Sequence, residues 1–150
     1  MKKLILSMAL LALLTGCASV KMEDKAASER AKQFARPSAG QAGLYVYRDS
    51  PLGAALKRNI WVDDKCLGES APNVFFYTEV APGNRKVSTQ SEFSPNDLAL
   101  LVEAGKNYFV RQYIKLGVFV GGTGLETIPE EQGKAAVAKL ELASAGTCNK

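Results

Sequence analysis

The stretch VFFYTEVAPGNRKVST, residues 74–89, carries the clearest fold signal in the chain. Residues 74–80 are a run of β-forming side chains, and the following APGN, residues 81–84, fits a type II turn, in which proline fixes φ and glycine supplies a positive φ. Beyond the turn, residues 86–93 alternate between apolar or β-branched and polar side chains. This order of strand, tight turn and strand predicts a mainly β domain.

Runs of the same kind continue on both sides of this stretch, at spacings near ten residues. They lie at 44–48, 59–62, 98–102, 108–116 and 118–120, with a short return strand at Cys66 and Leu67. We expect a tight reversal at Asp63 and Asp64, because aspartate tolerates positive φ better than most residues. Seven or eight such strands predict an antiparallel β-sandwich or a partly open barrel.

Helical periodicity returns near the C-terminus. Pro129 suits the first turn of a helix, and two glutamates follow it at the positive end of the helix dipole. The pattern predicts a helix from Pro129 to about Leu140, with Thr127 as the nearest capping residue. Residues from Leu142 onward are then a last strand or a tail.

The N-terminus has the organisation of an export signal. Two lysines precede an 11-residue apolar run from Leu4 to Leu14, which is too short for the about 20 residues of a membrane span. The run leads into Leu14-Thr15-Gly16-Cys17, which resembles the lipobox of bacterial lipoproteins. This resemblance implies cleavage between Gly16 and Cys17 and attachment of diacylglyceryl and palmitate-type acyl chains to Cys17. Ala18, rather than an aspartate, implies the outer membrane.

The segment between this signal and the β-rich region is polar. We interpret residues 17–42 as a lipid-anchored tether with a helix between Met22 and Arg36, which Pro37 ends, and with Phe34 available to dock on the domain. A disordered linker remains the alternative, and about 25 flexible residues span roughly 25–30 Å. The predicted organisation is therefore 1–16 signal peptide, 17–42 tether and 43–150 β-rich domain.

Composition excludes several classes of function. The chain has 19 basic and 15 acidic residues, and the two lysines of the signal leave only +2 on residues 17–150, without a basic cluster. Nucleic-acid binding is therefore not expected. The chain has no histidine, which removes His-based triads and His-containing metal sites. We predict no catalytic residues, no metal and no cofactor beyond the covalent lipid.

Three cysteines are present, and lipidation would use Cys17. Cys66 and Cys148 remain as a pair in an oxidising compartment, where disulfides persist. We predict a bridge worth about 4 kcal/mol in the chain-entropy description. The alternative is two unpaired thiols.

An aromatic-rich set, together with two arginines, offers a candidate binding surface. We select Tyr47, Arg48, Arg111 and Tyr113, since tyrosine and arginine are enriched where proteins bind partners. Cross-strand aromatic packing in a small sheet is the competing interpretation. The glycine-rich residues 121–124 do not fit a phosphate loop, because no helix follows them directly, and a flexible hairpin or sheet bulge is expected instead.

Two resemblances follow from these residues. Residues 61–89, with their VDDK, GE and VAPG segments, resemble the PEGA type of small β-rich surface module. More broadly, the chain from residue 32 to about 142 is similar to a family of bacterial lipoproteins with a domain of unknown function, on the strength of KQF at 32–34, GLYVYR at 43–48 and EAGKNY at 103–108. The family implies an all-β domain at the cell envelope and brings no established catalytic residues.

The sequence thus predicts a non-enzymatic protein, lipid-anchored in the outer membrane and facing the periplasm. We expect it to bind another envelope component, a protein or a glycan, or to support envelope assembly. The alternatives are a sensor that binds a small molecule or glycan, and a hydrolase that uses carboxylates.

Overall fold

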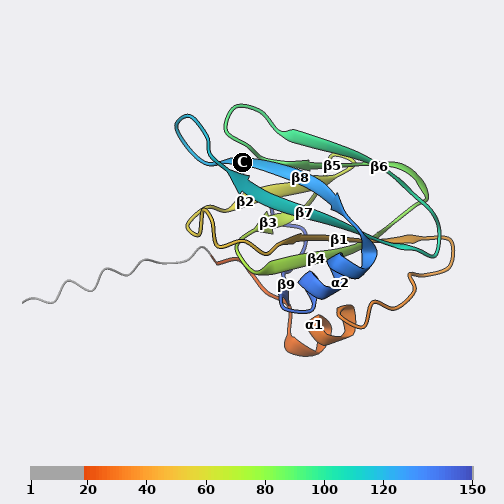
Figure 1. Cartoon of the computed structure of the whole chain (residues 1–150). Coiled ribbons are helices and arrows are strands. Elements are labelled where there is room, and N and C mark those ends of the chain that lie inside the picture. The colour runs from red at the N-terminus through yellow and green to blue at the C-terminus, as the bar shows by residue number, and fades with distance from the viewer. Residues whose placement is uncertain (1–18, 150) are drawn as a thin grey trace, which may run out of the picture.

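The computed structural model describes residues 19–149 (Figure 1). It contains nine strands and two helices in this range. In chain order they are α1 (Lys25–Ala31), β1 (Ala42–Arg48), β2 (Arg58–Val62), β3 (Lys65–Ser70), β4 (Val74–Val80), β5 (Gly83–Thr89), β6 (Asn96–Val102), β7 (Asn107–Lys115), β8 (Gly122–Ile128), α2 (Glu130–Val137) and β9 (Glu141–Leu142). The signal sequence, Gly16 and Cys17 lie outside the described residues.

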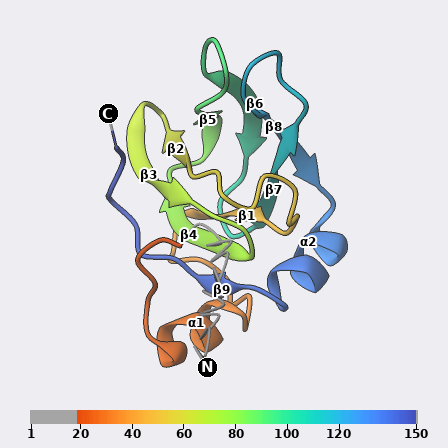
Figure 2. The same cartoon turned by 90° about the vertical axis from the view of Figure 1, so that its left-hand side faces the viewer.

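The strands form two sheets that face each other. One has five strands in the order β8-β7-β1-β4-β9, and the other has four in the order β3-β2-β5-β6. The apolar core between them includes Leu44 and Val46 of the first sheet and Ile60 and Val87 of the second. Both helices lie on the outer side of the five-stranded sheet (Figures 1 and 2). The predicted mainly β sandwich with a C-terminal helix is confirmed.

Two pairings in the five-stranded sheet depart from the antiparallel arrangement that the sequence predicts. Strand β1 runs parallel to β7, and β4 runs parallel to β9, while every other pairing is antiparallel. A parallel pair needs a long crossover connection. The connection between β1 and β7 is long enough, because it contains all four strands of the second sheet.

The two predicted turns behave differently. Asp63 and Asp64 have φ of 48° and 64°, and the turn pairs Val62 with Lys65, so the expected tight β2–β3 hairpin is present. Gly83 has the expected positive φ, 112°. It joins strands of different sheets, however, so the proline–glycine turn is a corner of the sandwich rather than the tip of a hairpin.

The region after β7 departs from the sequence prediction. Residues 118–120, expected as a strand, form a loop, and the glycine-rich segment begins β8, which pairs with β7 along its length. Helix α2 starts at Glu130 and ends at Val137, three residues before the predicted end. Thr127 is not its cap, because it lies within β8 and Pro129 occupies the N-cap position without a side-chain hydrogen bond.

The N-terminal arm contains a shorter helix than predicted. Asp24 caps α1 by accepting a hydrogen bond from the Ala27 backbone N–H at 2.7 Å. Upstream of the helix, Glu23 N–H donates to the Leu142 carbonyl and Ser144 N–H donates to the Lys21 carbonyl, which attaches the arm to the C-terminal segment.

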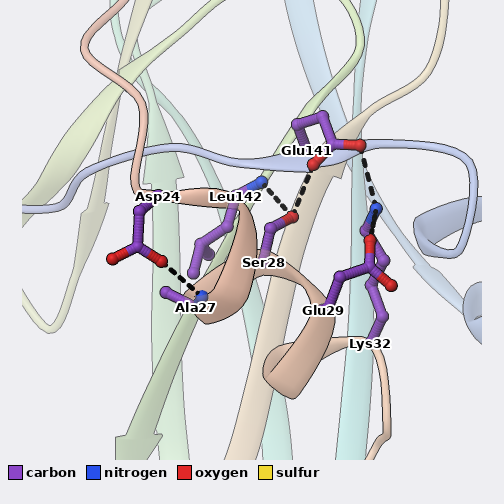
Figure 3. Close-up of polar contacts among 7 residues, drawn as sticks. All are labelled: Asp24, Ala27, Ser28, Glu29, Lys32, Glu141 and Leu142. Atoms are coloured by element: carbon purple, nitrogen blue, oxygen red, sulfur yellow. Dashed lines mark hydrogen bonds and ion pairs between the residues drawn. The ribbon is translucent and has the colours of Figure 1, made fainter.

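Ser28 joins the helix itself to β9 (Figure 3). Its hydroxyl donates to Glu141 at 2.7 Å and accepts from the Leu142 N–H at 3.1 Å, and Lys32 pairs with the same glutamate at 3.0 Å. Phe34 then packs on Tyr45 and Phe109, as predicted. Helix α1 lies within the range predicted for a helix in the arm, and the alternative of a disordered linker does not fit residues 20–42, because this segment is packed and hydrogen-bonded along much of its length.

Candidate functional site

The four residues selected as a binding surface do not form one. Tyr47 and Arg48 are 2% and 0% exposed, and only Arg111 and Tyr113 are partly accessible. Alternation along β1 directs neighbouring side chains to opposite faces, and both faces of this strand are covered, by the second sheet on one side and by the helices and the arm on the other. The structure thus corrects the predicted Arg/Tyr patch.

Arg48 has a structural role inside the sandwich. Its guanidinium donates to the carbonyls of Leu52 at 3.1 Å, Gly53 at 2.7 Å and Leu56 at 2.6 Å, so it holds the loop between β1 and β2. Burial and the nearby Arg58 lower its pKa to about 10. No carboxylate accepts from it in the described residues, which is unusual for a buried charge.

A buried polar chain connects the two sheets. The Ser70 hydroxyl bonds Gln112, whose amide donates to the Thr89 hydroxyl at 2.7 Å, and Thr89 donates to the Asn59 carbonyl at 3.1 Å. Gln112 is fully buried, and these partners satisfy its amide. We interpret this chain as an element that fixes the register of the sheets, because an unpaired buried amide would be costly.

The aromatic residues on the outer face of the five-stranded sheet pack on one another. Tyr45 stacks on Phe109 with ring centroids 4.9 Å apart and contacts Tyr77 at 4.7 Å. Its hydroxyl donates to the Ala31 carbonyl, and burial together with Glu79 raises its pKa to about 12. The competing interpretation, cross-strand aromatic packing, is therefore the one that the structure supports.

Arg111 is held by two carboxylates. Its guanidinium pairs with Asp49 at 2.7 Å and with Glu126 at 3.0 Å. The hydrogen bond that Arg111 donates to Asp49 is the main reason that the pKa of Arg111 is raised. This arrangement ties β7 to β8 and to the end of β1, and balances the charge of the guanidinium with two carboxylates.

The predicted disulfide is present between Cys66 and Cys148, with Cα atoms 5.9 Å apart and a sequence separation of 82. The bridge secures the C-terminal tail to β3, where Gly146 N–H also donates to the Leu67 carbonyl. The two-thiol alternative is excluded in this structure.

A feature that the sequence analysis missed lies at one end of the sandwich. The loops 49–57, 90–95 and 116–121 meet there, because β1, β5 and β7 all have their C-terminal ends at this end of the sandwich. We define the apolar tip as six exposed side chains on these loops, with their exposed fractions: Leu52 (53%), Phe93 (74%), Leu116 (94%), Val118 (73%), Phe119 (83%) and Val120 (51%). Among the described residues, only Met22 and Leu101 are further exposed large hydrophobic side chains.

The apolar tip is an ordered structure. The Glu92 carboxylate accepts hydrogen bonds from the backbone N–H groups of Val118 at 2.7 Å, Val120 at 3.2 Å and Phe119. Partial desolvation opposes ionisation, yet these three donors keep the pKa of Glu92 below its usual value. Gly117 permits the close approach, since a Cβ there would lie 1.6 Å from the Val120 carbonyl oxygen.

The side chains of the apolar tip contact each other across loops. Phe93 meets Phe119 edge to face with centroids 6.4 Å apart. A shallow groove lined by Leu52, Leu56 and Leu116 continues from them. The sequence signal was visible as the apolar run 118–120, but a short continuous run of β-forming residues is equally typical of a buried strand.

Two further observations concern the described residues alone. Residues 19–149 contain no group of three or more Cys, Asp or Glu side chains placed to hold a metal ion. Within the same range, neither helix has the length and apolar character needed to cross a bilayer.

These features define a small two-sheet β domain whose polar and aromatic groups mainly support its own structure. Comparison with known proteins places the chain in a family. A family described as "Protein of unknown function (DUF2846)" matches residues 38–123. An uncharacterized protein of Haemophilus influenzae is 55% identical over 131 residues, which cover 87% of this chain and 78% of the relative. The chain belongs to the DUF2846 family.

Proposed function

We propose that this protein is a lipoprotein of the bacterial outer membrane, anchored through Cys17 and facing the periplasm, which binds another envelope component without catalysing a reaction. The observation that carries the proposal is the sequence Leu14-Thr15-Gly16-Cys17 after a short apolar run. The disulfide between Cys66 and Cys148 supports it, because such bridges persist in oxidising compartments.

The chemistry at Cys17 would be a thioether to a diacylglyceryl group, followed by cleavage before Cys17 and acylation of the freed amine. Each buried methylene of an acyl chain contributes about 0.8 kcal/mol, so two or three chains would hold the protein permanently in the membrane. Ala18 in the next position favours transfer to the outer membrane over retention in the inner one.

A binding role is favoured over the two alternatives. The Tyr47 and Arg48 side chains, which a small-molecule sensor would need on its surface, are buried in structural contacts. Asp49 and Glu126, which a carboxylate-dependent hydrolase could use, are paired with Arg111. An exposed apolar surface, by contrast, is typical of proteins that contact other macromolecules or membranes.

The test of the anchor is the variant Cys17→Ala, with Ser19→Ala as the matched control in the same segment. We expect wild type and Ser19→Ala to fractionate with outer membranes and to begin, by intact mass, at an acylated Cys17. Cys17→Ala should retain its signal sequence or appear in the soluble fraction. A mature wild-type chain without acyl groups would disprove the proposal.

The binding role needs a separate experiment. Chemical crosslinking in intact cells, with the anchored wild-type protein as bait, should capture the same envelope protein or glycan repeatedly. A chain that shows no reproducible neighbour under these conditions would argue against this part of the proposal.

A further inference from the structure

The apolar tip exposes side chains that a soluble domain usually buries. Four of its six members are more than 70% exposed: Phe93, Leu116, Val118 and Phe119. Contiguous apolar surface of this kind marks contact sites. The hydrogen bonds that Glu92 accepts from the backbone N–H groups of Val118 and Val120 hold the loop in a conformation in which its apolar side chains point into solvent.

The position at which the chain leaves the domain limits where this tip can be. Val20 already packs against the core, and Lys21 is hydrogen-bonded to Ser144. Only Ala18 and Ser19 separate Cys17 from Val20. Three residue steps reach about 10 Å even when fully extended. An acylated Cys17 would therefore hold the domain directly against the bilayer instead of at the end of a long tether.

The side of the domain that faces the bilayer follows from the arrangement of the chain. In Figure 1 the coloured chain begins on the left of the molecule, and the loops 49–57, 90–95 and 116–121 lie on the same side. Figure 2 looks onto that side, and shows the start of the arm and all three loops facing the viewer. The exit point of the arm and the apolar tip thus share one side of the domain.

The charges around the apolar tip suit a phospholipid surface. Lys115 precedes Leu116 directly and is exposed, and Lys57, which also pairs with Glu69 at 3.7 Å, lies in the neighbouring loop. The three loops contain two acidic residues: Glu92 accepts hydrogen bonds from backbone N–H groups, and Asp49 pairs with Arg111. Basic side chains around an apolar protrusion fit a membrane interface, where the apolar groups enter the acyl boundary and the cations stay among the phosphates.

We propose that the apolar tip inserts into the interface of the same phospholipid bilayer that holds Cys17, so that the protein lies on the membrane by two attachments in a fixed orientation. This inference rests on the lipid anchor proposed above. A lipid surface is favoured over a protein partner because the tip projects from the domain and lies on the side where the chain exits. The opposite end of the sandwich then faces the periplasm and is free for a partner.

The experiment uses the full acylated protein in phospholipid vesicles that contain a fraction of anionic lipid, with and without brominated acyl chains. Two variants are compared, Phe119→Trp at the apolar tip and Leu101→Trp on β6, which replaces another exposed side chain (66%) near the other end of its strand. The native Trp61 gives the same background in both. Because each substitution changes an exposed position, both variants should fold, and thermal unfolding checks this.

We expect brominated lipid to reduce the emission of the tryptophan introduced by Phe119→Trp by about twofold, as for a group buried some 5–10 Å into the interface. The Leu101→Trp signal should match that of wild type. Equal signals from both variants, or no quenching at position 119, would overturn the docking while leaving the anchor intact, and would assign the tip to a protein partner. Failure of the wild-type protein to float with vesicles would overturn the anchor and the docking together.

Discussion

The Arg48 guanidinium donates a hydrogen bond to the Leu56 carbonyl at 2.6 Å from a position that is 0% exposed. With two more bonds to the same loop, this contact connects the end of β1 to the start of β2, the point where the chain passes from one sheet to the other. The loop 49–57, which carries Leu52 of the apolar tip, is therefore organised from inside the sandwich.

Replacing this side chain should destabilise the domain. We expect Arg48→Leu to lower the free energy of unfolding by about 2–4 kcal/mol. Three hydrogen bonds from a charged donor are lost, and the carbonyls that accepted them are left without a protein donor. Urea unfolding measures the loss. Arg85→Leu, which breaks a half-exposed pair with Asp63, is the control and should cost less than about 1 kcal/mol. Equal effects of the two variants would contradict the role assigned to Arg48.

Ser28 should decide whether the N-terminal arm stays on the domain. Ser28→Ala removes the hydroxyl that bonds both Glu141 and the Leu142 N–H, and we expect a loss of about 1–3 kcal/mol, expressed mainly as faster proteolysis between residues 20 and 42. Glu29→Ala, on the exposed side of the same helix, should leave proteolysis unchanged. Protection equal to that of wild type in Ser28→Ala would show that backbone hydrogen bonds and apolar contacts hold the arm without this hydroxyl.

The disulfide should contribute strongly to stability. Cys148→Ser is expected to lower the free energy of unfolding by about 4 kcal/mol, since the bridge closes a loop of 82 positions in the unfolded chain. Cys66→Ser/Cys148→Ser should cost no more than the single variant, because one bridge is lost in each. A melting temperature that does not respond to reduction of the wild-type protein would contradict this prediction.

Stability should fall at alkaline pH through the buried tyrosines. Burial, and then Asp49, raise the pKa of Tyr47 from 10.0 to about 12. Above pH 10 the Tyr47 hydroxyl therefore loses its proton in the unfolded chain but keeps it in the folded protein. Its contribution to the free energy of unfolding is complete below pH 10 and is lost as the pH approaches 12. By pH 10.5 the ionisation of Tyr47 should lower the free energy of unfolding by about 1 kcal/mol.

Tyr47→Phe isolates the effect of that hydroxyl. Its free energy of unfolding should decline less than that of wild type between pH 8 and pH 10.5, with Tyr113→Phe as the half-buried control. Because both proteins contain the same Arg48 and Tyr45, the difference between them reports position 47. Parallel declines would show that Tyr47 ionises normally in the folded state.

Glu92 should control the order of the apolar tip without affecting the fold. Glu92→Ala removes the acceptor for the N–H groups of Val118, Phe119 and Val120, and we expect their amide hydrogens to exchange about tenfold faster. Glu103→Ala, in the loop between β6 and β7, is the control and should leave these amides unchanged. The melting temperature should barely change, since the loop lies outside the core.

Several parts of the fold could be predicted because their signals are local. The Asp63-Asp64 hairpin follows from the φ that aspartate tolerates, and the helix after Pro129 follows from residues within one turn of it. The assignment of residues 118–120 as a strand was wrong because a short run of β-forming apolar residues has the same pattern in a buried strand and in a protruding loop. Strand β8, rich in glycine and polar residues, has no such signal and depends on its pairing with β7.

The prediction of a binding surface at Tyr47 and Arg48 was wrong for a related reason. Alternation shows that Tyr47 and Arg48 occupy opposite faces of β1, but it does not show whether either face is covered. Here both are, and all seven residues of β1 are buried. The apolar tip is formed by three loops that are far apart in the sequence, so no single segment predicts it.

The sequence by itself determined the β character of the domain, its tight turns, the pair of cysteines and the lipobox-like start, because each depends on residues that are neighbours along the chain or on simple chemistry. The tertiary structure alone decided which strands pair, that two pairs are parallel, that Arg48 is enclosed and that the apolar side chains gather at one end. These features depend on contacts between distant segments, whose free energy comes from burying surfaces that only the folded chain brings together.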